Sequence, residues 1–250
     1  MRLHIEVTPK DAAAIRKFFD HWAQSPMVVK RAQRNVEGQR DALTEKTLWH
    51  AIVTCLLTTQ QQRSGRNHPS RSSCGSSRSL SPLSVARRHG DVRSWAGGVL
   101  SSHGGIRRYN QLANEVAANL EILDSGGFGT LLTALRPLEK SSSKAAERAA
   151  AHLLDEMLAG VGPKQARNTL QSLGLSQYEI PLDSRVAKWL RRIGFPLPVA
   201  AAALSDPEYY DFVLDAFQDM AAAVDVLPCL LDAAIFASFD PAWTEAEVVW

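Results

Sequence analysis

Two residues of segment 158–183 could do chemistry together: the amine of Lys164 and the carboxylate of Asp183. Lys164 is expected in the first turn of a helix, where the helix dipole disfavours a cation and so favours the neutral amine, the form that acts as a nucleophile. A carboxylate such as Asp183 can stabilise positive charge that develops on a reacting sugar. The ordinary alternatives are a solvated surface lysine and an aspartate that only caps the next helix.

A glycine hairpin positions the lysine. Gly160, Val161 and Gly162 follow an amphipathic helical run, and Pro163 is a residue favoured at the first position of a new helix. We expect that helix to end at Gly174. Its free amides and the two glycines, which leave the backbone uncovered, would bind an anion, phosphate above all.

The pattern LAGVGPKQA (158–166), followed by IPLDSRVAKWL (180–190), resembles the helix-hairpin-helix (HhH-GPD) superfamily of DNA glycosylases and abasic-site lyases. In the bifunctional members the hairpin lysine is the nucleophile and the later aspartate its electrostatic partner, and these roles carry over to Lys164 and Asp183. The sequence of these two segments is most similar to that of prokaryotic 8-oxoguanine glycosylases. The resemblance therefore implies excision of an oxidised base, with 8-oxoguanine the best guess, through a lysine Schiff base followed by β-elimination.

The resemblance also assigns residues that handle the flipped base. In LLTTQQQR (56–63), Gln60 aligns with the amide that fills the gap left by the extruded base, and Gln61 is the close second. By its position at the C-terminus, Trp250 would stack on the base. The alternatives are a polar helix end for the glutamines and a core or frayed residue for the tryptophan.

Cationic residues and the hairpin form the expected DNA-binding set. The helix predicted over 184–192 carries cations on its polar side. The set consists of Gln60, Gln61, Gly160, Val161, Gly162, Arg185 and Lys188.

The three cysteines limit which cofactors the protein could hold. Cys55, Cys74 and Cys229 are far apart and predict neither a disulfide framework nor a zinc site. Some glycosylases of this superfamily carry an iron–sulfur cluster held by four cysteines, which this sequence cannot build. We expect no cofactor, and a monovalent cation bound at the hairpin is the one ion left open.

Charge and length are compatible with a DNA-binding protein. The formal net charge is only +2, but no lysine or arginine follows Arg192, and that tail is acidic. The asymmetry suits one face offered to DNA and an acidic region kept away from it, or it reflects ordinary solvated helices. No apolar run reaches the roughly 18 residues that a membrane span needs, and residues 1–10 lack a signal-peptide core. We expect a cytoplasmic, nucleoid-associated monomer that binds double-stranded DNA containing a damaged base and no membrane.

Helical periodicity dominates the chain, with no internal repeat and little sign of strand. We predict an all-α fold as a single unit over 1–250, and the resemblance implies two helical lobes flanking a DNA-binding cleft. Residues 40–138 would form the central lobe, 139–192 the helix-hairpin-helix with its catalytic pair, and both chain ends the second lobe. Residues 28–40 are expected to be irregular or weakly helical.

Residues 64–84 do not fit this pattern. They are rich in Ser, Arg, Gly and Pro, and predict a disordered or aberrant loop. One explanation is a basic insert that contacts DNA. The other is a local reading-frame error in the coding sequence, which resequencing would reveal.

Two other functions are compatible with the pattern. A non-catalytic helix-hairpin-helix module would grip the DNA backbone with the same glycines but would have no use for the lysine and aspartate. A glycosylase of the endonuclease III type would excise oxidised pyrimidines, although the missing cluster cysteines argue against it.

Overall fold

The computed structural model describes residues 6–58, 79–103 and 108–244, and these residues form helices and no strand. The predicted all-α fold class is therefore confirmed. The α-helices are α1 (Pro9–Trp22), α2 (Pro26–Arg31), α3 (Glu45–Thr58), α5 (Leu83–Ala86), α6 (Val92–His103), α7 (Tyr109–Ile122), α8 (Phe128–Leu135), α9 (Lys144–Met157), α10 (Pro163–Ser172), α11 (Ser184–Arg192), α12 (Pro207–Ala222) and α13 (Pro228–Phe239).

Short-range hydrogen bonds set the starts of α1 and α12. The Thr8 hydroxyl accepts from the Asp11 amide, and the Asp11 carboxylate accepts from the Thr8 amide, which makes a capping box at the start of α1. Asp206 caps α12 by accepting from the Tyr209 amide at 2.8 Å. Proline occupies the first turn of both helices, where its missing N–H costs nothing.

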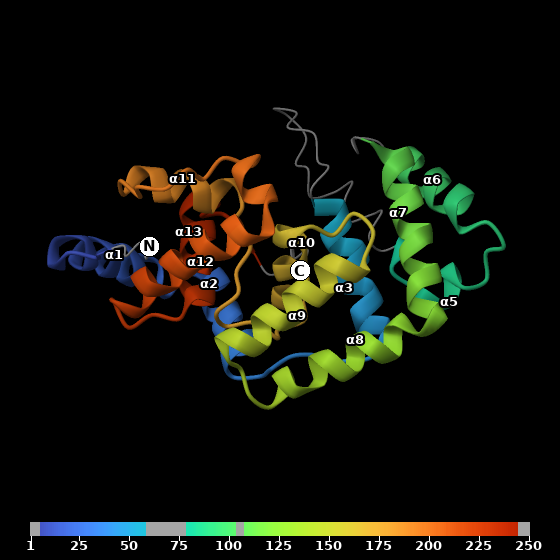
Figure 1. Ribbon diagram of the computed structural model, residues 1–250, viewed down its shortest axis with the longest axis horizontal. Coiled ribbons are helices and arrows are strands. Elements are labelled where there is room, and N and C mark those ends of the chain that lie inside the picture. The colour runs from blue at the N-terminus through green and yellow to red at the C-terminus, as the bar shows by residue number, and fades with distance from the viewer. Residues whose placement is uncertain (1–5, 59–78, 104–107, 245–250) are drawn as a thin grey trace.

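The buried side chains form two large clusters. One contains the apolar residues of the central helices, from Leu43 to Leu138, together with the inner faces of α9 and α10. The other joins Ile15 of α1 to the apolar faces of α11, α12 and α13, so both ends of the chain build it. In Figure 1, α1, α2, α11, α12 and α13 gather at one end, α5, α6 and α7 lie at the other, and α3, α9 and α10 lie between them.

Residues 28–40 are more ordered than expected. They contain the end of α2 and a π-helical turn, Ala32–Val36, and both Arg31 and Asn35 are buried. Their polar groups find partners far along the chain: Arg31 pairs with Asp232, and the Asn35 amide donates to the Ser176 carbonyl at 2.8 Å. Because satisfied polar groups can be buried, a stretch that looks like a polar loop becomes part of the interior.

The last part of the predicted loop 64–84 is also ordered. Ser79 and Leu80 are helical, α5 begins at Leu83, and the side chains of Leu80 and Leu83 are buried in the first cluster. The indole N–H of Trp49 donates to the Leu80 carbonyl at 3.1 Å, which fixes this segment against α3. The remainder of the predicted loop, residues 64–78, lies outside the described residues.

Candidate functional site

The turn between α9 and α10 is a tight glycine hairpin. Leu158 leaves the helical conformation, and the Val161 amide donates to the Leu158 carbonyl at 3.3 Å. Gly160 has φ +73°, a left-handed conformation that favours glycine. Gly162 has φ −99°, which any residue adopts, and a Cβ there would meet open space. Val161 buries its side chain in the core, so a ligand at that residue would touch its main chain only.

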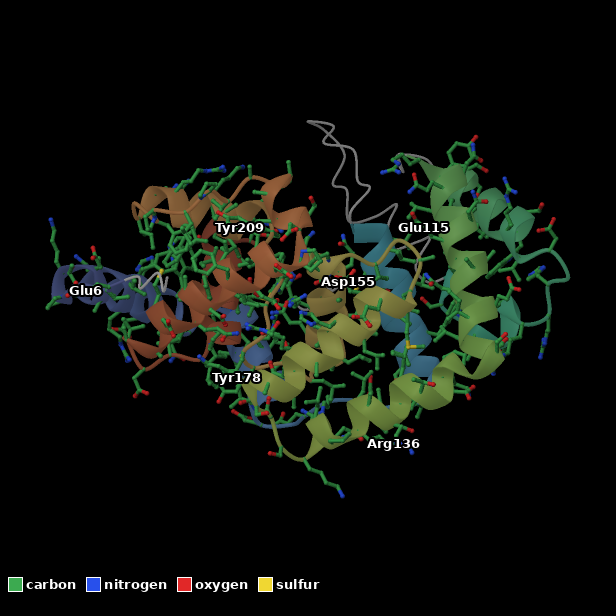
Figure 2. All side chains as sticks on the ribbon, viewed as in Figure 1. Glu6, Glu115, Arg136, Asp155, Tyr178 and Tyr209 are labelled. Carbon is green, nitrogen blue, oxygen red and sulfur yellow. The ribbon has the colours of Figure 1, made fainter. Side chains whose placement is uncertain are left out.

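Helix α7 holds the hairpin in place. The buried Asn119 donates through its amide nitrogen to the Ala159 carbonyl at 2.9 Å and accepts from the Ala159 amide at 2.7 Å. One turn earlier on α7, Glu115 (labelled in Figure 2) lies so close to Gly160 that a Cβ on the glycine would collide with its carboxylate. The sequence analysis missed Asn119, because an asparagine inside a helix carries no signal of a distant partner.

Lys164 is the second residue of α10 and is half-buried. Its surroundings include Cys55 of α3, a buried thiol that hydrogen-bonds Thr169 of α10 and lies within electrostatic reach of Lys164. Burial raises the pKa of the Cys55 thiol to about 12. Helix α3 therefore runs past the lysine as it approaches its end at Thr58.

Asp183 begins α11. Its Oδ1 accepts from the amides of Arg185 and Val186 at 2.7 and 3.0 Å, and its Oδ2 pairs with the Arg185 guanidinium at 3.1 Å. The carboxylate is thus a helix cap, as in the ordinary alternative for this residue. Its Oδ2 faces the cationic side chain of Arg185. Both Lys164 and Asp183 are described residues, and no ion pair joins them. Each stands in the first turn or at the cap of its own helix.

Buried carboxylates hold the non-helical segment that leads from α10 to Asp183. Glu147 of α9 accepts from the consecutive amides of Gln177, Tyr178 and Glu179, each at 2.8 Å. Burial raises the pKa of Glu147. Because these amides have no helix or sheet partner, the carboxylate supplies the acceptors that a buried backbone requires.

A second buried acid next to Asp183 was missed by the sequence analysis. Asp232 of α13 pairs with Arg31 at 3.3 Å and accepts from the Gln171 side chain of α10 at 2.8 Å. Burial raises the pKa of Asp232 to about 6, and the nearby Asp183 carboxylate acts in the same direction. The sequence did carry one signal of this burial, because Asp232 stands among apolar residues of a helix.

The two cations predicted to bind DNA lie on α11 against aromatic rings of α13. The Arg185 guanidinium is 4.3 Å from the centroid of Phe236, and the Lys188 ammonium is 5.9 Å from that of Phe239. Such placement orients the charged ends without burying them. Their contact with DNA stays a prediction, as does that of the hairpin.

The acidic tail is not simply solvated, and that it is kept away from DNA stays a prediction. Asp211 of α12 pairs with the buried Arg167 of α10 and with His152 of α9, and Asp215 pairs with Arg148 at 2.7 Å. These contacts join α9 and α10 to α12. The acidic residues therefore have a partly structural role, which net charge alone could not reveal.

Gln60, Gln61 and Trp250 lie outside the described residues, so their predicted roles stay untested. Within the described part of the chain, no group of three or more His, Cys, Asp or Glu side chains could hold a metal ion. None of the helices described is both long and apolar enough to cross a bilayer.

Solved structures similar to this chain include 8-oxoguanine DNA glycosylases. The 8-oxoguanine DNA glycosylase of Methanocaldococcus jannaschii matches with a TM-score of 0.68 and 14% identity, over 95% of this chain and 98% of that one. The 8-oxoguanine DNA glycosylase of Thermotoga maritima matches with a TM-score of 0.65 and 17% identity, over 92% and 96%.

A further match is the M. jannaschii 8-oxoguanine glycosylase/lyase in complex with a 15mer DNA containing 8-oxoguanine, with a TM-score of 0.66, 14% identity and coverage of 92% and 98%. No protein-family model and no curated protein matches the sequence. At these identities the matches establish a shared fold: the chain has the all-helical fold of these 8-oxoguanine DNA glycosylases.

Proposed function

We propose that this chain is a bifunctional DNA glycosylase and abasic-site lyase that excises an oxidised base, 8-oxoguanine first among them. What carries the proposal is the placement of Lys164 directly after the glycine hairpin and of Asp183 at the start of α11. They stand in a fold shared almost end to end with 8-oxoguanine glycosylases.

Lys164 is the proposed nucleophile. Its amine would attack C1′ of the damaged nucleotide, forming a C–N bond while the bond from C1′ to the base breaks and its electrons leave with the base. The nitrogen would lose a proton, which the departing base takes up. The resulting aminal would open to a Schiff base as the bond from C1′ to the ring oxygen breaks and that oxygen is protonated. Loss of a C2′ proton would then expel the 3′ phosphate by β-elimination.

Asp183 is the proposed stabiliser of positive charge on the sugar. Its two amide hydrogen bonds fix the carboxylate at the start of α11, so the charge would not need to reorganise during the reaction. Arg185, which pairs with it, would turn toward a DNA phosphate together with Lys188.

The hairpin would bind the DNA backbone. The first turn of α10 lacks a capping side chain at Gly162, so its free amides would donate hydrogen bonds to a phosphate. Gln60, with Gln61 as second choice, would fill the space left by the flipped nucleotide, and Trp250 would stack on the base. No cofactor enters this scheme.

A binding module without catalysis is the second candidate, because the hairpin alone would serve it. A glycosylase for oxidised pyrimidines is the third. The two differ from the proposal in what happens to the DNA, so one assay distinguishes them.

The test uses end-labelled duplexes with a single 8-oxoguanine opposite cytosine, or a single oxidised pyrimidine, with the parent chain and with Lys164→Gln. The proposal is supported if the parent chain cleaves the 8-oxoguanine duplex without alkali and Lys164→Gln does not. Cleavage of the duplex with the oxidised pyrimidine, but not of the 8-oxoguanine duplex, would identify an oxidised pyrimidine as the substrate instead. Salt-sensitive binding of both duplexes, with neither cut even after alkali, would favour the binding module.

A further inference from the structure

A buried tyrosine holds the peptide segment that ends at Asp183. The hydroxyl of Tyr210, on α12, donates to the Ile180 carbonyl at 3.0 Å and accepts from the Leu182 amide at 2.6 Å. Tyr210 and Ile180 are completely buried, and Leu182 is only 4% exposed. These peptides belong to no helix, so the hydroxyl satisfies groups that would otherwise be buried without a partner.

The face of the same tyrosine ring carries the side chain that holds the first turn of α10. The Arg167 guanidinium lies 4.6 Å from the Tyr210 ring centroid and donates to the Pro163 carbonyl at 3.2 Å. Pro163 immediately precedes Lys164, and Leu182 immediately precedes Asp183. One stacked pair therefore contacts the backbone next to both proposed catalytic residues.

The guanidinium is fixed from several sides. Its Nε donates to Glu179 at 2.9 Å, and a terminal nitrogen pairs with Asp211. The other oxygen of Glu179 accepts from Arg148 at 3.1 Å. Because Arg167 and Glu179 are both completely buried, a shift of either would leave a charge unpaired in the interior.

We propose that Tyr210, with Arg167 stacked on its ring, is a positioning residue that sets the Asp183 carboxylate relative to Lys164. The inference rests on the proposed function. Neither Tyr210 nor Arg167 is expected to touch DNA. The hydroxyl acts through the Leu182 amide, one peptide away from Asp183, and the stacked arginine acts through the Pro163 carbonyl.

The test is Tyr210→Phe, which removes only the hydroxyl and keeps the ring under Arg167. Tyr209→Phe is the matched control: this neighbour on α12, labelled in Figure 2, is more exposed, and its hydroxyl donates to the Pro198 carbonyl away from the pair. Three quantities are measured for each variant: duplex affinity, the single-turnover rate of base release, and the rate of strand cleavage at a preformed abasic site.

Base release builds positive charge on the sugar and needs Asp183 in place, whereas Schiff-base formation at an open abasic aldehyde needs chiefly Lys164. Tyr210→Phe should therefore slow base release by roughly ten- to hundredfold, as a displacement of about 1 Å can. Affinity and abasic-site cleavage should change little, and Tyr209→Phe should behave as the parent.

An equal loss in base release and abasic-site cleavage would overturn the inference, because a general loss of structure affects both steps. Unchanged base release in Tyr210→Phe would overturn it as well, while leaving the proposed function intact. A parent chain that releases no base and cleaves no abasic site would instead overturn the proposed function, and the inference with it.

Discussion

Asn119 offers a quantitative test of how the hairpin is held. Asn119→Ala removes both hydrogen bonds to Ala159, at 2.9 and 2.7 Å. Each such bond contributes about 1 kcal/mol net, and a buried group left without a partner costs more. Because Ala159 is only half-buried, water can replace part of the loss. We expect the free energy of unfolding to fall by about 2 kcal/mol.

The same substitution should weaken DNA binding. If the hairpin shifts and one amide-to-phosphate hydrogen bond is lost, affinity should fall by about tenfold, because a hydrogen bond to a charged group is worth about 1.5–3 kcal/mol. Urea unfolding followed by circular dichroism gives the stability, and fluorescence anisotropy with a labelled duplex at several salt concentrations gives the affinity. Asn114→Ala, at an exposed position of the same helix, is the control.

Asn119→Asp sharpens the prediction. An ionised carboxylate can still accept from the Ala159 amide but faces the Ala159 carbonyl with an oxygen, so it should destabilise the protein more than alanine at pH 8. Once protonated, the introduced carboxyl group can donate to the Ala159 carbonyl and so restore the second hydrogen bond. Because the folded state favours this protonated form, the pKa of the group is raised on folding. Stability should therefore be regained as pH falls. If Asn119→Ala and Asn114→Ala gave the same stability and affinity, the idea that Asn119 holds the hairpin in place would be refuted.

Three further predictions concern the hairpin and the buried acid. Gly162→Ala should fold normally, since its φ suits any residue and its Cβ meets open space, yet lose duplex affinity if a phosphate approaches there, as anisotropy would show. Glu115→Gln should tighten duplex binding about threefold, because removing a charge roughly 6 Å from a phosphate in water is worth about 0.7 kcal/mol. Burial raises the pKa of Asp232 from 3.8 to about 6. The native state then binds more protons than the unfolded state between these values, so the unfolding free energy should fall by about 2 kcal/mol as pH rises from about 4 to 6. Asp232→Asn should flatten that part of the pH profile, apart from a constant loss from the broken ion pair with Arg31.

Matched controls and contrary results differ among the three. For Gly162, the control is Gly129→Ala, at an exposed position in α8 where a Cβ also meets open space, and equal affinities of the two variants would contradict the prediction. For Glu115, weaker or unchanged binding by the glutamine variant would argue against a phosphate at the hairpin. For Asp232, parallel stability profiles of parent and variant between pH 4 and 6 would show that its pKa is not raised.

Local signals accounted for the helices. Thr8 before Pro9 and Asp206 before Pro207 marked helix starts, because capping and the fixed φ of proline act within a few residues. Gly174, with φ +72°, marked an end for the same kind of reason. Such elements could be predicted without knowing what they pack against.

Long-range polar pairs could not be predicted in this way. The contacts of Arg167 with Glu179 and Asp211, and of Asn119 with Ala159, join segments that meet only in the folded chain. In the sequence Arg167 and Asn119 look like ordinary polar positions on helices. The hairpin and Lys164 were found because their glycines and proline act locally, whereas the groups that hold Asp183 in place were not.

The central claim is that Lys164 forms a covalent intermediate with DNA, and borohydride trapping tests it most directly. The parent chain and Lys164→Gln are incubated with a duplex holding one 8-oxoguanine opposite cytosine and with an abasic duplex, in the presence of borohydride. The trapped protein is then digested, and the cross-linked peptide is identified by mass spectrometry. We predict a complex with the parent only, cross-linked at Lys164. A cross-link at another residue, equal trapping of Lys164→Gln, or no complex with either duplex would contradict the account.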